Sequence, residues 1–208
     1  MALADTPLRD LLAAFSSPDP TPGGGSASAL ASATGASLLM MVAGLPKTRS
    51  GSGGDAERAA LAAAKTALEG IRSRLTAAID ADAGAYDQVV AAYRLPKGTP
   101  AEQAARKAAI QQALRAATEV PLEVMRLSAA AIEQANTVAA NGHRAAASDV
   151  GVAAALLGAG LRGAALNIEI NVGSVADEAY VARVKVESAR LSEDAARIAG
   201  ETDALLRS

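Results

Sequence analysis

The sequence predicts an all-α bundle of about five or six helices, organised as one domain over residues 1–208. Half of the 208 residues are apolar, and nearly all of that share is Ala, Leu and Val, whereas aromatic residues make up only 2%. Small side chains fill a core only where backbones approach closely, as helices can, and Ala has the highest helix propensity. The chain also shows no strand-like alternation and no internal repeat, so helices are favoured over a β-sandwich.

The first two expected helices are separated by a proline-rich stretch. Residues 7–15 form a short amphipathic helix, and the three prolines within 17–23 then prevent helix formation. Ser26 follows three glycines, and we expect it to cap a helix that runs to about residue 45. A breaker rich in Gly and Ser covers residues 46–54.

Two long helices follow, joined by a proline-containing turn. We expect Asp55 to cap a helix over residues 55–93. Thr99 is then expected to cap a helix over residues 100–139, which begins with a proline at its first position. Pro121 lies inside this helix and is expected to kink it.

The last two expected helices follow a break at Asn141-Gly142. Ser148 or Asp149 is expected to cap an apolar helix over residues 150–172, and a final amphipathic helix covers about 175–205. The apolar helix contains regularly spaced Gly and Ala and should be enclosed on every side. One layer of neighbouring helices is too little for that, so we expect a homodimer. Four polar residues within it argue against a membrane span.

Composition excludes several classes of function. A net charge of −2 argues against nucleic acid as a partner, because phosphate binding needs a basic surface. No Cys and a single His exclude a Cys nucleophile and the common metal clusters, so we expect no metal site. No positively charged start precedes an uninterrupted apolar run, which predicts a cytoplasmic protein without membrane association.

The long central helix interrupts its own apolar stripe at Asp82. Steps of three and four place Asp82 between Ile79 and Tyr86 on the inward face, whereas Asp80 lies about 200° away and is expected to be solvated. A buried carboxylate is costly unless it is paired or hydrogen-bonded, and desolvation raises its pKa toward the range of a general acid or base. The alternative is a structural Asp that caps a neighbouring helix or pairs with an Arg.

Two other candidates lie at helix ends. Lys97 is on the turn after the long helix, where the alternative is a solvated loop lysine. Ser148 and Asp149 lie at the start of the apolar helix, with Asn141 upstream. They either cap that helix or bind a polar ring edge through side chains and free backbone donors.

Two further features suit a neutral heterocycle or an anion. Asn167 and Asn171 are four residues apart on one helical face, where paired amides bind hydrogen-bonding edges or join two helices. The glycines at 23–25 leave amide N–H groups uncovered at a helix start, which suits an anion or oxyanion, or else they permit close packing. We assign His143, the only histidine, no catalytic role.

Six short motifs occur in order along the chain. They are Pro20-Thr-Pro-Gly-Gly-Gly-Ser26, Asp80-Ala-Asp-Ala-Gly-Ala-Tyr86, Leu95-Pro-Lys97, Val120-Pro-Leu122, Ser148-Asp-x-Gly151 and Leu166-Asn-x-x-x-Asn171. Together, over about residues 7–185, they resemble the family comprising formiminotetrahydrofolate cyclodeaminase and stand-alone methenyltetrahydrofolate cyclohydrolase.

The resemblance implies an all-helical, dimeric folate enzyme in which Asp82 is the catalytic aspartate and Lys97 lies in the active-site turn. The residues implied to bind the tetrahydrofolate substrate are Gly23, Gly24, Gly25, Ser26, Tyr86, Asn141, Ser148, Asp149, Asn167 and Asn171. The implied reaction is hydrolysis of 5,10-methenyltetrahydrofolate to 10-formyltetrahydrofolate, with no cofactor beyond the folate. The alternatives are an ammonia-releasing cyclodeaminase and a non-catalytic helical folate-binding module.

The implied chemistry fits these residue types. The methenyl carbon is already electrophilic, so Asp82 would take a proton from water and favour the cation, while Lys97 would supply a proton. Two positions depart from the family pattern. The family usually has a Lys-rich stretch that includes an aromatic residue where this chain has the Gly- and Ser-rich residues 46–54. Gly142-His143 stands where the family has a Gly-Asn pair. Altered ligand preference or loss of activity therefore stays open.

Overall fold

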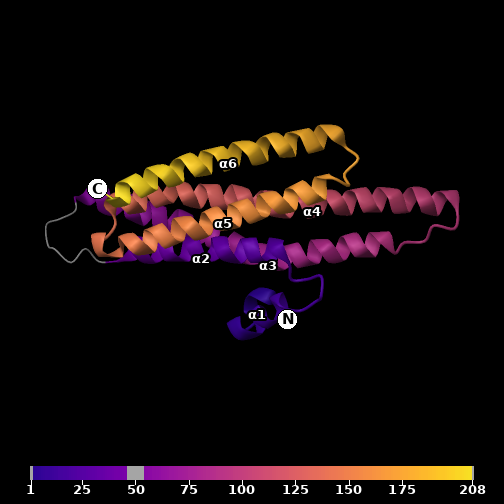
Figure 1. Ribbon diagram of the computed structural model, residues 1–208, viewed down its shortest axis with the longest axis horizontal. Coiled ribbons are helices and arrows are strands. Elements are labelled where there is room, and N and C mark those ends of the chain that lie inside the picture. The colour runs from indigo at the N-terminus through magenta and orange to yellow at the C-terminus, as the bar shows by residue number, and fades with distance from the viewer. Residues whose placement is uncertain (1, 46–53, 208) are drawn as a thin grey trace.

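The computed structural model describes residues 2–45 and 54–207, and in these residues it contains helices and no strands (Figure 1). The α-helices are α1 (Leu8–Phe15), α2 (Gly24–Gly44), α3 (Asp55–Tyr93), α4 (Pro100–Asn141), α5 (Ala147–Val172) and α6 (Glu178–Arg207). Two 3-10 turns, Leu3–Asp5 and Arg144–Ala146, precede α1 and α5. The predicted all-α class is confirmed, whereas most of the predicted breaker at 46–54 lies outside the described residues.

Three of the expected helix starts are wrong by one to three residues. α2 begins at Gly24 with Gly23 as its N-cap, so Ser26 is not a cap. Gly54 rather than Asp55 is the N-cap of α3. α5 begins at Ala147, and its N-cap residue makes no side-chain capping bond, so neither Ser148 nor Asp149 caps it. In the first and last cases the polar residue lies inside the helix, where its side chain has other partners or faces solvent.

The predicted start of α4 is confirmed in detail. Thr99 Oγ1 accepts a hydrogen bond from the Glu102 N–H at 3.2 Å, and the Glu102 carboxylate accepts one from the Thr99 N–H at 2.8 Å. This reciprocal pair is a capping box, with Pro100 at the first helical position. The helix then continues through Pro121 to Asn141.

α2 and α5 pack side by side at a distance that only glycine permits. A Cβ on Gly160 would lie 2.6 Å from the Ser28 carbonyl oxygen and closer still to Ser32 Oγ. A Cβ on Gly163 would collide with Ser28 Oγ. The small residues that the sequence places on both helices therefore bring the two backbones together.

α5 is not enclosed on every side, contrary to the prediction. It packs against α2, α4 and α6, but Ile170 is 78% exposed, and Val152 and Leu166 are more than half exposed. Leu166 and Ile170 follow Val152 by 14 and 18 positions, which are close to four and five turns of a helix with 3.6 residues per turn. The three side chains therefore lie on one outward face. The single chain leaves this apolar face uncovered.

Two other parts of the chain project from the bundle. α3 and α4 continue beyond the ends of α2 and α5 as a two-helix extension, which contains the turn at residues 94–99 and which we call the arm (Figure 1). Tyr93 and Leu95 are exposed on it. α1 lies apart from the bundle, with Leu8 65% exposed.

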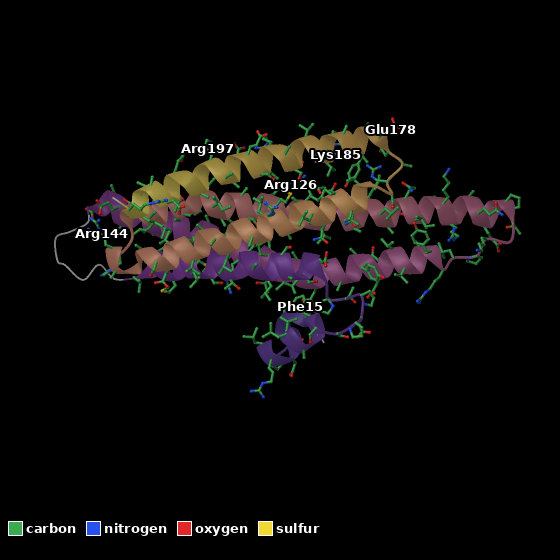
Figure 2. All side chains as sticks on the ribbon, viewed as in Figure 1. Phe15, Arg126, Arg144, Glu178, Lys185 and Arg197 are labelled. Atoms are coloured by element: carbon green, nitrogen blue, oxygen red, sulfur yellow. The ribbon has the colours of Figure 1, made fainter. Side chains whose placement is uncertain are left out.

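α6 is joined to α4 by a charged cluster around Arg126 (Figure 2). The Arg126 guanidinium donates to both carboxylate oxygens of Glu187, at 2.7 and 2.9 Å, and lies within 4 Å of the carboxylates of Glu119 and Glu123. The Arg126 guanidinium lowers the pKa of the Glu187 carboxyl, and the Glu187 carboxylate raises the pKa of Arg126. None of these four residues lines the Asp82 pocket described below.

Two helical stretches, Gly24–Gly44 and Arg144–Val172, are long and apolar enough to cross a membrane by length and composition. Half of the apolar window in the first and 39% of that in the second are buried inside the bundle. Core helices satisfy the same criterion, so this feature alone does not indicate a membrane protein.

Candidate active site

The Asp82 carboxylate faces inward from α3 toward the start of α2, as its place in the apolar stripe predicts. Its Oδ2 accepts hydrogen bonds from the Ser26 N–H at 2.9 Å and from Ser26 Oγ at 3.1 Å. Burial raises the pKa of the Asp82 carboxyl above its ordinary value, and the two Ser26 hydrogen bonds lower it in part. The partners of this carboxylate are thus the two donors of Ser26 rather than an Arg.

Gly25 makes room for this carboxylate. A Cβ on Gly25 would lie 2.7 Å from Asp82 Oδ2 and closer still to Cγ and Oδ1. The glycine run at 23–25 therefore allows α3 to place a carboxylate directly against the first turn of α2. The predicted close-packing role of these glycines is confirmed at Gly25.

Asp82 lines a cavity of about 290 Å³ between α2, α3, α4 and α5. Of the residues predicted to bind substrate, it contains Gly23, Gly24, Gly25, Tyr86, Asn167 and Asn171. The remaining lining residues are Pro20, Thr21, Ala85, Val89, Leu114 and Ala117. Asp82 is the only carboxylate among them, and the other side chains are neutral.

The two asparagines also have structural bonds. Asn171 Nδ2 donates to the Ala117 carbonyl of α4 at 2.8 Å, which is the helix–helix contact that the sequence left as an alternative. Asn167 Nδ2 donates to the Gly163 carbonyl one turn earlier, at 2.8 Å. These bonds use one donor of each amide, which keeps a second N–H and an acceptor oxygen, and both residues line the cavity.

Ser26 does not reach the cavity, although it was predicted to bind substrate. It is fully buried, and its Oγ lies 2.8 Å from the Ile79 carbonyl oxygen as well as near Asp82. Its position two residues inside α2 turns both donors toward α3. Ser26 therefore contacts the Asp82 carboxylate without lining the cavity.

Within one chain, the second predicted catalytic residue is remote from Asp82. Lys97 lies beyond Tyr93, the last residue of α3, which is about 17 Å along the helix axis from Asp82 at about 1.5 Å per residue. Lys97 is at the tip of the arm and exposed. Its predicted role therefore requires a second chain.

The cluster of Asn141, Ser148 and Asp149 is also separate from the Asp82 pocket in a single chain. Ser148 lies about 28 Å along α5 from Asn167, at about 1.5 Å per residue. Asn141 Nδ2 donates to its own helix, to the Thr137 carbonyl at 2.9 Å. The family resemblance implied that these residues share one pocket with Asp82, and a single chain does not bring them together.

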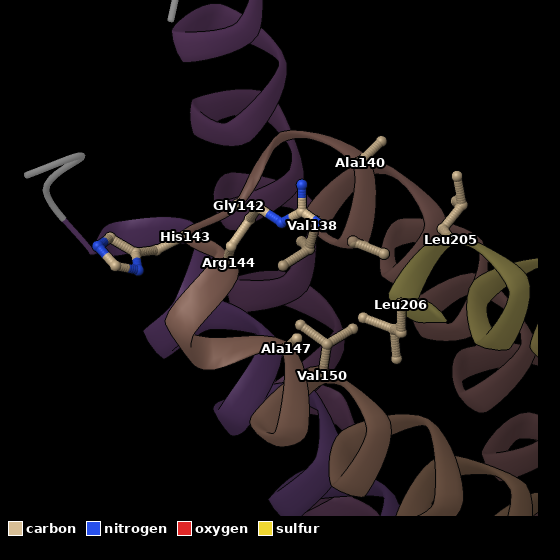
Figure 3. Close-up of a pocket in the computed structure, with 10 residues that line it drawn as sticks. Val138, Ala140, Gly142, His143, Arg144, Ala147, Val150, Leu205 and Leu206 are labelled. Carbon is tan, nitrogen blue, oxygen red and sulfur yellow. The ribbon is translucent and has the colours of Figure 1, made fainter. Parts of the chain in front are cut away.

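A second cavity of about 370 Å³ lies at this other end of the bundle, between α4, α5 and the end of α6 (Figure 3). Val138, Val150 and Leu206 form its apolar side, and the His143 ring points away from them (Figure 3). His143 Nδ1 accepts a hydrogen bond from the Ala145 N–H at 3.1 Å. The departure at Gly142-His143 is therefore remote from Asp82 within one chain.

Asp80 has a role that the sequence did not indicate. Its carboxylate accepts hydrogen bonds from the N–H groups of Leu3 and Ala4 and so holds the first 3-10 turn against α3. It was expected to be only a solvated charge, because the periodicity of α3 carries no information on where the N-terminal segment lies. Asp80 and Asp82 thus divide into a structural and a pocket carboxylate.

Several cavity residues escaped the sequence reasoning. Leu114 and Ala117 of α4, and Ala85 and Val89 of α3, are apolar residues of ordinary helical stripes, which give no functional signal. Pro20 and Thr21 were within a recognised motif, but the stretch that contains them was treated as a helix breaker.

Among the described residues, no group of three or more His, Cys, Asp or Glu side chains is arranged to hold a metal ion.

The fold and the pocket define a class: an all-helical protein with a cavity lined by one half-buried carboxylate beside neutral polar groups, an arrangement typical of sites for acid–base chemistry. The family model described as formiminotransferase-cyclodeaminase matches residues 7–190. The chain belongs to this family, as the six motifs predict.

Individual relatives agree with this assignment. The chain is 40% identical over 173 residues to a methenyltetrahydrofolate cyclohydrolase of Methylorubrum extorquens, an alignment that covers 83% of this chain and 82% of that protein. It is 33% identical over 194 residues to the formimidoyltransferase-cyclodeaminase of Sus scrofa, which covers 93% of this chain and 36% of that protein. The chain thus spans about a third of the second relative.

A solved structure shows the same fold. The crystal structure of formiminotetrahydrofolate cyclodeaminase from Thermotoga maritima matches with a TM-score of 0.86, covering 98% of this chain and 96% of the other. Sequence identity in this match is 23%. It confirms the all-helical architecture.

Proposed function

We propose that this chain is a methenyltetrahydrofolate cyclohydrolase, which converts 5,10-methenyltetrahydrofolate and water to 10-formyltetrahydrofolate. One observation carries the proposal: a half-buried carboxylate, Asp82, is the only acid in a cavity otherwise lined by neutral groups. The 40% identity to a protein of this name supports the same substrate.

The reaction needs a group that can hold and return a proton. The methenyl carbon lies between two nitrogens and shares their positive charge, so it is already electrophilic. Asp82 accepts a proton as water adds to this carbon, and its negative charge favours the cation before addition. The bond from carbon to the ring nitrogen then breaks. Of the two protons of the water, one ends on that nitrogen and the other in solvent.

The decisive measurement follows the absorbance of methenyltetrahydrofolate after mixing with the protein. We expect the wild type to accelerate its loss and Asp82→Asn, which keeps the size and the hydrogen-bond acceptor, to lose most of this effect. If both proteins match the uncatalysed rate, the cyclohydrolase proposal is wrong for this substrate. Binding of the folate without turnover would then favour the non-catalytic module.

A second candidate is formiminotetrahydrofolate cyclodeaminase activity. The 33% identity to a formimidoyltransferase-cyclodeaminase favours it, and the same carboxylate can manage the proton when a nitrogen attacks the formimino carbon and ammonia leaves. Release of ammonia from formiminotetrahydrofolate, measured with the same pair of proteins, distinguishes this activity from hydrolysis.

The proposal includes a homodimer, supported by apolar surface that one chain leaves uncovered. The outward face of α5 carries Val152, Leu166 and Ile170, and it adjoins α2, which contains no charged residue. Exposed apolar faces of this kind are typical of protein–protein interfaces, which supports the dimer. Light scattering at micromolar concentration should give twice the mass of the chain, and Ile170→Glu should shift it toward monomer. Val186→Glu, at an exposed residue of α6, is the matched control. A monomeric wild type would remove the dimer.

A dimer also decides the predicted role of Lys97. If the arm of one subunit supplies Lys97 to the Asp82 pocket of the other, Lys97→Ala and Asp82→Asn should each be inactive. Mixed dimers of the two variants would contain one intact site, and a 1:1 mixture should regain about a quarter of wild-type activity. If mixed dimers form and no activity returns, Lys97 does not contribute to a site shared between subunits.

A cytoplasmic location and the absence of membrane association stay predictions.

A further inference from the structure

Both donors of Ser26 lie within hydrogen-bond distance of one oxygen of Asp82. The backbone N–H and Oγ lie 2.9 and 3.1 Å from Oδ2. Oδ1 is the carboxylate oxygen nearer to the position that a Cβ on Gly25 would take, and Gly25 lines the cavity. The carboxylate is therefore asymmetric: Ser26 holds Oδ2, and Oδ1 lies closer to Gly25.

The Ser26 hydroxyl has a choice of acceptors, because it carries one proton. The Ile79 carbonyl oxygen is 2.8 Å away and Asp82 Oδ2 is 3.1 Å away, and both can be reached from the same buried position. A hydroxyl donates more strongly to an ionised carboxylate than to a neutral carbonyl. It can thus donate to Asp82 when that group is charged and to Ile79 when it is protonated.

We propose that Ser26 is a positioning residue, which anchors Oδ2 of Asp82 through a hydroxyl that follows its charge state and leaves Oδ1 to exchange the catalytic proton. The proposal rests on the proposed function, since it assigns the oxygen of Asp82 that acts. It replaces the substrate-binding role that the sequence predicted for Ser26.

In the described part of the chain, no charged side chain other than Asp82 lines the pocket, so none competes with Ser26 for a bond to the Asp82 carboxylate. Among the described residues that line the cavity, Asp82 and Tyr86, both from α3, are the only ones that titrate. α2 contributes glycines, α4 contributes Leu114 and Ala117, and α5 contributes two neutral amides. Burial and the two Ser26 donors are the causes that set the pKa of Asp82.

The test is the pH profile of Ser26→Ala. Loss of a hydrogen bond to the charged form raises the pKa of the base, so the acid limb of kcat/KM should move up by about one pH unit, a tenfold change in proton affinity. Ser26→Thr keeps the hydroxyl and should leave the limb in place. Ser28→Ala is the control: Ser28 is also buried on α2, and its Oγ donates at 2.6 Å to the Gly24 carbonyl rather than to Asp82.

A second measurement separates this inference from the proposed function. The ¹³C resonance of the Asp82 carboxyl reports its titration without any substrate, and its midpoint should rise by the same amount in Ser26→Ala. If the midpoint rises in a protein that has neither activity, the proposed function is wrong, but the positioning role of Ser26 is supported. If the enzyme is active and Ser26→Ala moves neither the acid limb of kcat/KM nor the midpoint, the positioning role of Ser26 is wrong. If Ser26→Ala does not fold, Ser26→Cys, with its weaker donor, should shift both upward, and no shift there counts against the proposal equally.

Discussion

Replacing Gly25 with Ala tests the site most directly, because the structure gives the size of the disturbance. The new Cβ would lie 2.7 Å from Asp82 Oδ2 and closer to Oδ1, whereas ordinary contacts of this kind are about 3.5 Å or longer. The carboxylate must therefore move by about 1 Å or more. That movement stretches or breaks the 2.9 Å bond from the Ser26 N–H.

We expect Gly25→Ala to lower kcat by about 100-fold or more, since a displacement of about 1 Å at a reacting group costs on this order. The fold should survive, because the group that must yield is the end of a side chain and Ala favours a helix. The assay is the loss of methenyltetrahydrofolate absorbance, with circular dichroism and thermal melting to verify folding. Gly84→Ala, also on α3 and with nothing within 4 Å of its Cβ, is the control and should stay active.

A Gly25→Ala protein with near wild-type kcat would refute the reasoning, because Asp82 could not then hold the observed position during turnover. A protein that fails to fold would show instead that the first turn of α2 depends on this glycine. Near-normal activity in Asp82→Asn together with an inactive Gly25→Ala would assign the catalytic role to another group in the pocket.

Four further predictions concern close contact, burial and charge. Gly160→Ala should destabilise the protein by about 1–3 kcal/mol, because its Cβ would meet the Ser28 backbone. Gly158→Ala, two residues away with open space, should stabilise it by about 0.5–1 kcal/mol in the same chemical denaturation assay. Because burial raises the pKa of Asp82, the folded state holds this proton more tightly than the unfolded chain, whose Asp titrates at about 3.9. Stability relative to Asp82→Asn should therefore be lost as pH rises from about 4 through the raised pKa, and melting of both proteins across this range verifies the sign. A cationic substrate favours ionised Asp82, so the acid limb of kcat should lie at lower pH than that of kcat/KM, and equal limbs would contradict this charge pairing.

The helices themselves could be predicted because they depend on local physics. Thr99 as the cap and Pro100 at the first helical position predict the start of α4 from two adjacent residues, and the structure confirms both. The inward direction of Asp82 also follows from a helix that turns every 3.6 residues. Such signals need only the residues of one element.

Contacts between elements were harder to foresee. Ser26 was predicted to be an N-cap because Ser commonly caps helices, but α2 begins two residues earlier. The Ser26 hydroxyl instead lies within hydrogen-bond distance of the Ile79 carbonyl and the Asp82 carboxylate. The N-terminal segment at Leu3 and Ala4 could not be matched to Asp80 for the same reason. These partners depend on how helices are placed, which periodicity does not encode.

The uncovered face of α5 is the most useful disagreement between sequence and structure. Its composition predicted enclosure, and one chain gives enclosure on the α2, α4 and α6 sides only. A fully apolar helix is stable when its outward side is also covered. In the proposed homodimer, a second subunit would cover Ile170 and could also contact the arm that carries Lys97, so we expect one interface to explain both discrepancies.

The charge of the pocket explains why one geometry can serve both candidate reactions. Each involves a one-carbon unit between two nitrogens whose positive charge changes as a bond forms, and each needs a proton moved at that moment. Asp82 provides a single negative charge, and the neutral amides of Asn167 and Asn171 add hydrogen-bonding capacity without a competing charge. A second carboxylate would hold the cation too firmly, and an Arg would repel it. We therefore expect the shape of the pocket around Asp82, rather than its charge, to decide between water and an internal nitrogen as the nucleophile.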